Sequence, residues 1–209
     1  MEFRNIFCIG RNYVDHAVEL GNDVPDQPMV FSKPLNSLVY ADGKEIHYPG
    51  NRGEIHHELE VVLYIGKDMT DEDFWVDEIV SKMALGIDLT LRDVQSELKK
   101  KGHPWLLAKG FKNAAIVTEF WDFPGEAVCR ERDFCLLRDG KTVQKGNITS
   151  MIFSFRTILA YIQANFGLKK GDIIFTGTPE GVGPISNGEK YELRWGEESK
   201  GGFGIRMNE

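Results

Sequence analysis

Residues 54–66 of this chain read EIHHELEVVLYIG, and this stretch decides the fold. Residues 58–65 are mostly apolar and rich in β-branched side chains, which predicts a buried β-strand. Side chains alternate between the two faces of a strand, so Glu58 and Glu60 should project from one face, about 7 Å apart. Two such carboxylates repel each other and lose hydration unless a cation lies between them. A half-exposed strand with two solvated carboxylates is the alternative, and this segment alone does not decide between the two.

A third carboxylate, Asp88, favours the cation. It lies in residues 83–91, MALGIDLTL, a second β-like run. Three oxygen ligands without a thiolate select a hard ion and leave positions open for substrate and water. Zinc is an alternative because His56 and His57 precede Glu58. Adjacent strand residues point to opposite faces, however, so the two histidines cannot bind one metal ion, and the spacing is not the His-Glu-x-x-His of metalloproteases. The sequence therefore predicts a Mg²⁺ site, with Mn²⁺ or Ca²⁺ as possible substitutes.

Composition and charge narrow the class of protein. The chain has 209 residues, 42% hydrophobic and 27% charged, which predicts one globular domain over residues 1–209. The formal charge of −7 and the pI near 5.3 argue against nucleic acid or a membrane surface as a partner. No stretch approaches the ~18 apolar residues of a membrane span, and we expect a cytoplasmic protein. Cys8, Cys129 and Cys135 are scattered, so we expect reduced thiols.

Hydrophobic periodicity along the rest of the chain predicts many short strands and few helices. Strands are predicted at 3–9, 29–33, 37–40, 45–48, 58–65, 83–89, 172–176, 190–195 and 203–207. Helices are predicted at 12–20, 90–98 and 154–166, a hairpin at 134–143 turning at Asp139–Gly140, and a loop or helical turn at 68–78. Without the regular alternation of a doubly wound sheet, this pattern indicates a β-rich α+β fold.

Three further groups of residues are candidates for chemistry. His16 and Glu19 are three apart in a predicted helix, where a carboxylate can raise the basicity of an imidazole that activates water; a solvated surface ion pair is the alternative. Lys109 is flanked by apolar residues and is either a buried cation facing an anionic ligand or a snorkelling lysine. The loop at 176–184, TGTPEGVGP, lacks nucleotide-binding motifs. It either presents backbone N–H groups and the Thr178 hydroxyl to a carboxylate or is simply a tight turn.

The order of the motifs along the chain is more specific than any one of them. They are GRNYVDH (10–16), FSKP (31–34), HELE (57–60), DLTLRDVQ (88–95), KKKGHPW (99–105), LAK (107–109) and GTPEGVGP (177–184). Together they resemble the fumarylacetoacetate hydrolase family, most closely its short, single-domain acylpyruvate hydrolase and oxaloacetate decarboxylase branch. The resemblance extends from about residue 8 to residue 185 and weakens after Pro184. It implies a mixed β-roll or sandwich core that forms a homodimer, with a lid at about 12–24.

The resemblance also implies roles for particular residues. The Mg²⁺ ligands are Glu58, Glu60 and Asp88. The catalytic residues are the lid dyad His16 and Glu19 and the active-site lysine Lys109, and the substrate-binding residues are Arg11, Arg92, Gln95 and Thr178. Relatives often have Ser at the position of Gly110, so one hydroxyl contact is expected to be absent here.

The implied substrate is a small 2-oxo acid that loses its C3–C4 bond and leaves a pyruvate enolate, which the metal stabilises as a Lewis acid. Metal and three carboxylates sum to one negative charge, so a dianion needs Lys109 and Arg92 nearby. Where C4 is a ketone, His16 and Glu19 would activate water for acylpyruvate hydrolysis; where it is a carboxylate, as in oxaloacetate, CO₂ leaves. An isomerase of the 5-carboxymethyl-2-hydroxymuconate type is an alternative. A non-catalytic metal-binding scaffold is the alternative of another class.

Overall fold

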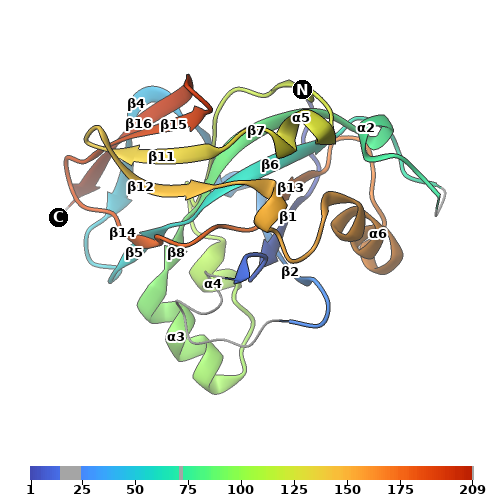
Figure 1. Ribbon diagram of the computed structural model, residues 1–209. Helices are drawn as coiled ribbons and strands as arrows, with labels where there is room; N and C mark the ends of the chain where they lie inside the picture. The colour runs from blue at the N-terminus through green and yellow to red at the C-terminus, as the bar shows by residue number, and fades with distance from the viewer. Residues whose placement is uncertain (15–24, 71–72, 209) are drawn as a thin grey trace.

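The structure is a computed structural model that describes residues 1–14, 25–70 and 73–208 (Figure 1). In these ranges the largest sheet has eight strands. Its main path is β2 (Met29–Lys33), β1 (Ile6–Gly10), β13 (Ile173–Phe175), β6 (Leu59–Ile65), β7 (Val80–Asp88), β9 (Ala115–Val117) and β3 (Leu38–Tyr40), with β10 (Trp121–Asp122) paired to β7. The sheet is mixed: β1 pairs parallel with β13, whereas β6 pairs antiparallel with both β13 and β7.

Two smaller sheets and several short helices complete the described structure. The second sheet is β12 (Lys141–Gly146), β11 (Phe134–Arg138), β15 (Lys190–Trp195), β16 (Glu198–Asn208) and β4 (Asp42–Pro49), and the third is β14 (Gly183–Pro184), β5 (Ile55–His57) and β8 (Thr90–Leu91). The α-helices are α2 (Val76–Ile79), α3 (Arg92–Lys101), α4 (Leu106–Lys109), α5 (Glu126–Arg130) and α6 (Phe155–Phe166); short 3₁₀ turns are η1 (Leu35–Ser37) and η2 (Ile148–Ser150). The strand-rich α+β prediction is confirmed.

The central strand β6 is buried along its whole length, which explains why its sequence is apolar on both faces. One face, including Val61 and Leu63, packs into a core shared with the second sheet, where Phe134 and Leu193 lie. The opposite face carries Glu60 and then Val62 and Tyr64, which belong to a smaller apolar cluster with β1, β9 and β13. The carboxylate of Glu60 is therefore followed along the same face of β6 by buried apolar side chains.

Helix boundaries follow from capping. The Ser154 side chain accepts a hydrogen bond from the Thr157 N–H at the start of α6, and the helix ends before Gly167, which has a φ of 75°. Helix α3 ends at Gly102 in the left-handed conformation, after three lysines that complement the helix dipole. No helix among the described residues combines the length and apolarity that crossing a membrane requires.

Several predicted boundaries were wrong. The helix predicted at 90–98 begins two residues later, because 90–91 pair with β5 as strand β8. The strand predicted at 45–48 begins at Asp42, because the Asp42–Gly43 pair continues along β16 and does not separate two elements. The strand predicted at 3–9 begins three residues later and ends one residue later, as β1 (Ile6–Gly10).

Other predictions were incomplete or remain untested. Strand β9 and helix α5 carried too little pattern for prediction. Of the helix predicted at 12–20, Asn12 and Tyr13 are not helical, and residues 15–20 lie outside the described residues, as does most of the lid predicted at 12–24.

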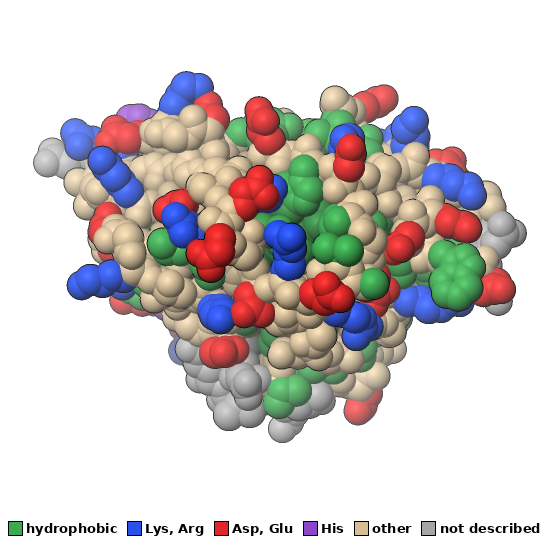
Figure 2. All heavy atoms as spheres, turned by 45° about the horizontal axis from the view of Figure 1, so that its top comes forward, with side chains coloured by type: hydrophobic (Ala, Val, Ile, Leu, Met, Phe, Trp, Pro, Cys, Tyr) green, Lys and Arg blue, Asp and Glu red, His purple; other side chains and the backbone are tan. Residues whose placement is uncertain are grey.

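Charges of both signs are interspersed over the face of the molecule shown in Figure 2, with hydrophobic side chains between them. That face carries no continuous basic stripe of the kind that binds a phosphate backbone.

Candidate functional site

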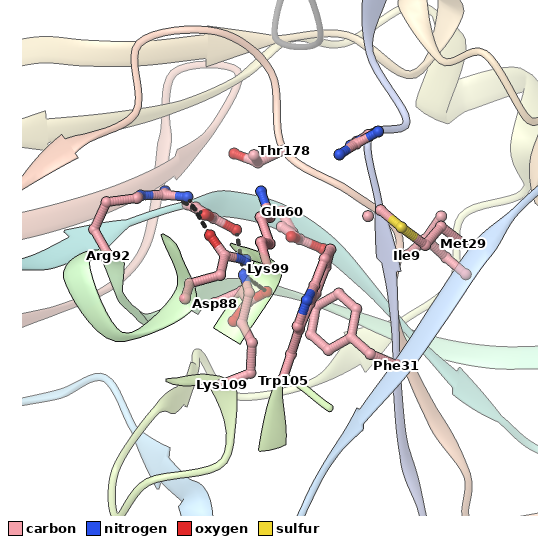
Figure 3. Close-up of a pocket in the computed structure, with 14 residues that line it drawn as sticks. Ile9, Met29, Phe31, Glu60, Asp88, Arg92, Lys99, Trp105, Lys109 and Thr178 are labelled. Carbon is pink, nitrogen blue, oxygen red and sulfur yellow. Dashed lines mark hydrogen bonds and ion pairs between the residues drawn. The ribbon is translucent and has the colours of Figure 1, made fainter. Parts of the chain in front are cut away.

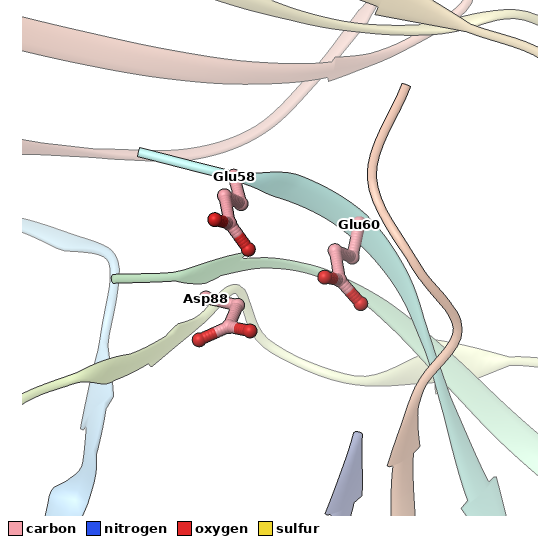
Figure 4. A group of neighbouring side chains, drawn as sticks. All are labelled: Glu58, Glu60 and Asp88. Atoms are coloured by element: carbon pink, nitrogen blue, oxygen red, sulfur yellow. The ribbon is translucent and has the colours of Figure 1, made fainter. Parts of the chain in front are cut away.

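Three carboxylates converge at the ends of neighbouring strands (Figure 4). Glu60 on β6 lies opposite Gly86 on β7, and the Asp88 N–H donates a 2.8 Å hydrogen bond to the Glu58 carbonyl. One carboxylate oxygen from each of Glu58, Glu60 and Asp88 lies within 4.8 Å of the other two. These residues are 5%, 1% and 0% exposed, which eliminates the half-exposed strand with solvated carboxylates.

The close approach of these strands depends on two glycines. A Cβ at Gly86 would lie 2.7 Å from side-chain atoms of Phe175 and Val62. Gly177 has a φ of 102°, and its N–H donates a 2.7 Å hydrogen bond to Glu60 Oε2. The glycine-rich loop therefore directs this backbone N–H at the protein's own carboxylate. One of the two interpretations of this loop was that it presents N–H groups to a carboxylate, and for Gly177 that carboxylate is Glu60.

Three cations, two of them buried, surround two of the three carboxylates. Lys109 Nζ donates to both Glu58 and Asp88 at 2.7 Å. The second Glu58 oxygen is 2.6 Å from the Arg92 guanidinium, and the second Asp88 oxygen is 2.6 Å from Lys33 Nζ. Burial alone would lower the pKa of Lys109, but the charges of Asp88 and Glu58 outweigh it and raise this pKa. Lys109 is therefore a fixed cation, and the snorkelling alternative is excluded by its 3% exposure.

Glu60 differs from its two neighbours. Among the described residues, no lysine or arginine forms an ion pair with it. Burial, followed by the charges of Asp88 and Glu58, raises the pKa of Glu60 well above its ordinary value. A divalent cation between the three carboxylates would relieve this repulsion, and a purely carboxylate donor set suits a hard ion. The residues present thus fit Mg²⁺ or Mn²⁺.

The histidines before Glu58 do not join this group. His57 Nδ1 is 2.8 Å from Gln144 Oε1, and His56 Nε2 is 3.1 Å from the Glu54 carboxylate. Their side chains point to different partners, as strand alternation requires. A zinc site built on both histidines is therefore excluded.

The carboxylates lie in a pocket that combines charge with aromatic walls (Figure 3). It is lined by Ile9, Gly10, Arg11, Met29, Phe31, Glu58, Glu60, Asp88, Arg92, Gln95, Lys99, Trp105, Lys109 and Thr178. These include every predicted metal-binding and substrate-binding residue, and Lys109. His16 and Glu19 lie outside the described residues, so their catalytic roles stay predictions.

Three of the predicted substrate-binding side chains form hydrogen bonds within the protein. On α3, Arg92 donates a 2.9 Å hydrogen bond to Gln95 Oε1 while pairing with Glu58. Thr178 Oγ1 accepts a 2.9 Å hydrogen bond from the Gln144 amide, whose oxygen accepts another from the Leu59 N–H. Gln144 thus connects the glycine-rich loop to the start of β6.

Sequence reasoning assigned no role to two residues that organise the site. Lys33 is buried, pairs with Asp88, and donates to the backbone carbonyls of Leu89 and Lys109. A lysine ending a predicted strand, in the motif FSKP, carries the same signal of a charge in an apolar setting that identified Glu60. Gln144 has no comparable signal, because it is one polar residue among several in a hairpin strand.

The expected loss of a hydroxyl at Gly110 has a steric explanation. A Cβ at this position would lie 2.7 Å from Pro34 Cδ, 2.8 Å from Leu106 Cδ1 and 2.9 Å from the Leu106 carbonyl oxygen. The backbone after Lys109 is therefore packed too closely for serine without movement of α4 or of the loop at Pro34.

The sequence of the chain matches a known family over nearly its full length. The model described as fumarylacetoacetate (FAA) hydrolase C-terminal matches residues 5–203. The chain belongs to the fumarylacetoacetate hydrolase family. The match extends past Pro184 to residue 203, beyond the range of about 8 to 185 over which the motifs resemble the family.

Individual relatives give the same assignment and are enzymes. The chain is 39% identical over 193 residues to the mitochondrial oxaloacetate tautomerase FAHD1 of Bos taurus, covering 90% of this chain and 86% of that protein. It is 38% identical over 189 residues to the mitochondrial oxaloacetate decarboxylase of Dictyostelium discoideum, covering 89% and 86%. The solved fumarylpyruvate hydrolase from Pseudomonas aeruginosa, in complex with Mn²⁺ and pyruvate, superposes with a TM-score of 0.89 at 30% identity, covering 99% of this chain and 91% of that one.

Proposed function

We propose that this protein is a Mg²⁺- or Mn²⁺-dependent enzyme that converts oxaloacetate, and related 2-oxo acids, through the enolate of their pyruvate portion. The observation that carries the proposal is the buried group of Glu58, Glu60 and Asp88 with Lys109 directly beside it. The names of the relatives, an oxaloacetate tautomerase and an oxaloacetate decarboxylase, support oxaloacetate as the first substrate to test.

Charge balance supports an anionic substrate. The three carboxylates are matched by three cations in ion-pair contact with Glu58 and Asp88, namely Lys33, Arg92 and Lys109. A divalent ion then brings the group to two positive charges, which a dicarboxylate such as oxaloacetate neutralises. Lys33, Arg92 and Lys109 together therefore change the balance of one negative charge for metal and ligands alone to two positive charges.

The chain's own residues supply positioning and electrostatics. Bound at this site, the metal ion would supply Lewis-acid stabilisation of charge that develops on the 2-keto oxygen. Lys109 already donates to Glu58 and Asp88 and would act as a further donor to a developing oxyanion. Arg92 and Gln95 face the pocket from α3 and can bind a substrate carboxylate. Phe31 and Trp105 exclude water from one side, which strengthens each of these interactions.

An enolate at C2–C3 is common to three reactions, but it forms differently in each. In tautomerisation a base removes a C3 proton and the enolate is protonated on oxygen, or the reverse. In decarboxylation the C3–C4 bond of the keto form breaks, CO₂ leaves and the pyruvate enolate is protonated at C3. In hydrolysis water adds to a C4 ketone, the C3–C4 bond breaks to release a carboxylic acid, and the pyruvate enolate is again protonated at C3.

Decarboxylation needs neither an activated water nor a base, so charge stabilisation by the site would suffice for it. Tautomerisation also needs a group that accepts the C3 proton. An isomerase acting on 5-carboxymethyl-2-hydroxymuconate would depend on the same kind of proton transfer.

The test follows oxaloacetate in one sample by two signals, the enol absorbance and the formation of pyruvate. We expect acceleration of at least one signal with Mg²⁺ or Mn²⁺, loss of that acceleration with chelator, and recovery on adding the metal back. Unchanged rates with metal-saturated protein, over a panel that includes acylpyruvates and hydroxymuconates, would instead favour a non-catalytic metal-binding scaffold.

A second candidate function is acylpyruvate hydrolysis, favoured by the structural similarity to fumarylpyruvate hydrolase. If His16 and Glu19 activate water, His16→Ala should reduce hydrolysis by roughly 10²–10⁴-fold and affect oxaloacetate much less. Glu19→Ala should follow with a smaller loss. Equal, large losses on both substrates would assign the pair to lid closure or substrate binding; equal, small losses would make it a surface contact.

Assembly and location complete the proposal. We propose a homodimer, to be checked by sedimentation of the purified protein, and a cytoplasmic location, to be checked by fractionation of the source cells. The word mitochondrial in the names of several relatives makes the organelle fraction the necessary comparison.

A further inference from the structure

Helix α3 presents three polar side chains to the pocket. Arg92, Gln95 and Lys99 are spaced three and four residues apart, so they lie on one face of the helix, and all three line the pocket. Lys100 points elsewhere and pairs with Glu97 at 2.9 Å on the exposed side. Of the three consecutive lysines that end α3, Lys99 alone lines this pocket in the described structure (Figure 3).

Lys99 is a cation in a crowded cationic setting. Its Nζ lies 5.1 Å from the centroid of the Trp105 ring, and among the described residues no carboxylate forms an ion pair with it. Partial burial lowers the pKa of the Lys99 ammonium, and neighbouring positive charges, that of Arg11 foremost, lower it further. Lys109, by contrast, is matched by Glu58 and Asp88.

We propose that Lys99, with Arg11, forms a subsite for the distal carboxylate of a dicarboxylic 2-oxo acid. The inference rests on the proposed function and narrows its substrate class from 2-oxo acids in general to those with a second carboxylate. Such a group would relieve the repulsion between Lys99 and Arg11, while the 2-oxo carboxylate end lies at the metal-binding carboxylates and Arg92. Monoanionic acylpyruvates would leave Lys99 without a counter-charge and should bind more weakly.

Binding of two matched ligands tests the subsite without relying on turnover. The ligands are 2-oxoglutarate and 2-oxopentanoate, which have the same five-carbon chain and 2-oxo carboxylate end but differ in the distal carboxylate. Titration calorimetry on the full chain at saturating Mn²⁺ compares wild type with Lys99→Met. We expect wild type to prefer 2-oxoglutarate by roughly 10- to 100-fold, the value of a charge-assisted hydrogen bond. In Lys99→Met most of that preference should disappear, while the affinity for 2-oxopentanoate stays within about threefold of wild type.

Lys101→Met is the matched control, because it removes the same charge from the same helix turn without touching the pocket. It should keep the wild-type preference and have the same melting temperature as Lys99→Met. Loss of preference in both variants would assign the effect to the general field of the helix end and overturn the subsite. A preference retained by Lys99→Met, or absent from wild type, would overturn it as well. If the preference behaves as expected but no 2-oxo acid is converted, the proposed function fails and the subsite stands.

Discussion

The floor and the wall of the pocket differ in how their charges are partnered. The floor consists of Glu58, Glu60, Asp88 and Lys109, with Lys33 behind Asp88, and the wall of Arg92, Gln95, Lys99, Phe31 and Trp105. On the floor nearly every charge is buried and meets an opposite one at ion-pair distance. On the wall, Arg92 pairs with Glu58 of the floor, whereas Lys99 forms no ion pair with a carboxylate among the described residues. We infer that the floor, with Arg92, serves the chemistry common to all substrates, whereas Lys99 selects among them.

The difference also predicts how each part tolerates mutation. Removing one partner of a buried ion pair leaves an uncompensated charge and costs roughly 3–5 kcal/mol. Asp88 is in contact with two such cations, Lys33 and Lys109, whereas Glu60 pairs with none among the described residues. Substitution of Glu60 should therefore change mainly metal affinity, whereas substitution of Asp88 should change both metal affinity and the stability of the metal-free protein.

Glu60→Ala should have the largest effect on metal binding. It removes one of three ligands, so we expect Mn²⁺ affinity to fall by more than the roughly 10- to 100-fold typical of an outer-shell change, with activity lost in parallel. The metal-free variant loses the repulsion from Asp88 and Glu58 but also the hydrogen-bond acceptor of the Gly177 N–H, so we expect it to lose less stability than Asp88→Ala. Mn²⁺ titration and chemical denaturation with chelator measure the two quantities.

Asp88→Ala is the contrasting variant. It should also lose metal, but it should destabilise the metal-free protein because Lys33 and Lys109 lose their common partner. Equal stability losses in the two variants would contradict the prediction that Asp88, and not Glu60, is the partner of buried cations.

Lys109→Met should have the next largest effect. We expect kcat to fall roughly 10²–10³-fold, as for a lost oxyanion donor, on every 2-oxo acid that wild type converts. Metal affinity should not fall, because the Lys109 ammonium occupies oxygens of Glu58 and Asp88 that a metal ion also needs. Steady-state kinetics and Mn²⁺ titration test this. A near-wild-type kcat/KM would remove Lys109 from the catalytic residues.

Lys33→Met should have a smaller effect on activity and a clear one on stability. Lys33 does not line the pocket; it holds Asp88 and the backbone of Lys109 from behind, so we regard it as a positioning residue. We expect stability to fall by roughly 3–5 kcal/mol, as for a broken buried ion pair, and kcat to fall less than in Lys109→Met. KM should change little. A variant as stable as wild type would show that Asp88 and Lys109 are positioned without Lys33.

The floor was the most predictable part of this molecule. Glu58, Glu60 and Asp88 are charges inside apolar strand patterns, and strand periodicity was enough to place the two glutamates on one face. Their convergence with Asp88 depends on the antiparallel pairing of β6 with β7, which no local pattern specifies. Family resemblance supplied that long-range information.

The wall and the supporting contacts were harder to predict. Lys99 belongs to a run of three lysines that helix capping alone would explain, and only the position of α3 shows which one lines the pocket. The hydrogen bonds of Gln144 join residues far apart in the sequence, so its environment is a property of the tertiary fold. Strand β9, only three residues long, is specified by its neighbours β7 and β3 more than by its own sequence.

The smallest expected effect is a pH dependence that isolates Glu60. Burial and the charges of Asp88 and Glu58 raise its pKa in the metal-free protein above the ordinary value of 4.5. Between that value and the raised pKa, the folded state holds a proton that the unfolded state has released. The free energy of unfolding therefore decreases as pH rises through this window. The stability that comes from the proton on Glu60 is fully present only below the window.

Chemical denaturation at several pH values, with chelator, compares wild type with Glu60→Gln, which keeps the shape of the side chain but cannot titrate. The free energy of unfolding of wild type minus that of Glu60→Gln should decrease as pH rises. Buried His57, whose pKa is lowered chiefly by burial, titrates in both proteins and cancels in the difference. Bound Mg²⁺ replaces the proton on Glu60. The increase in the free energy of unfolding of wild type that saturating Mg²⁺ causes should therefore become larger as pH rises through the same window. Parallel curves for the two proteins would mean that Glu60 is ionised without a metal and that the floor has a cation for it after all.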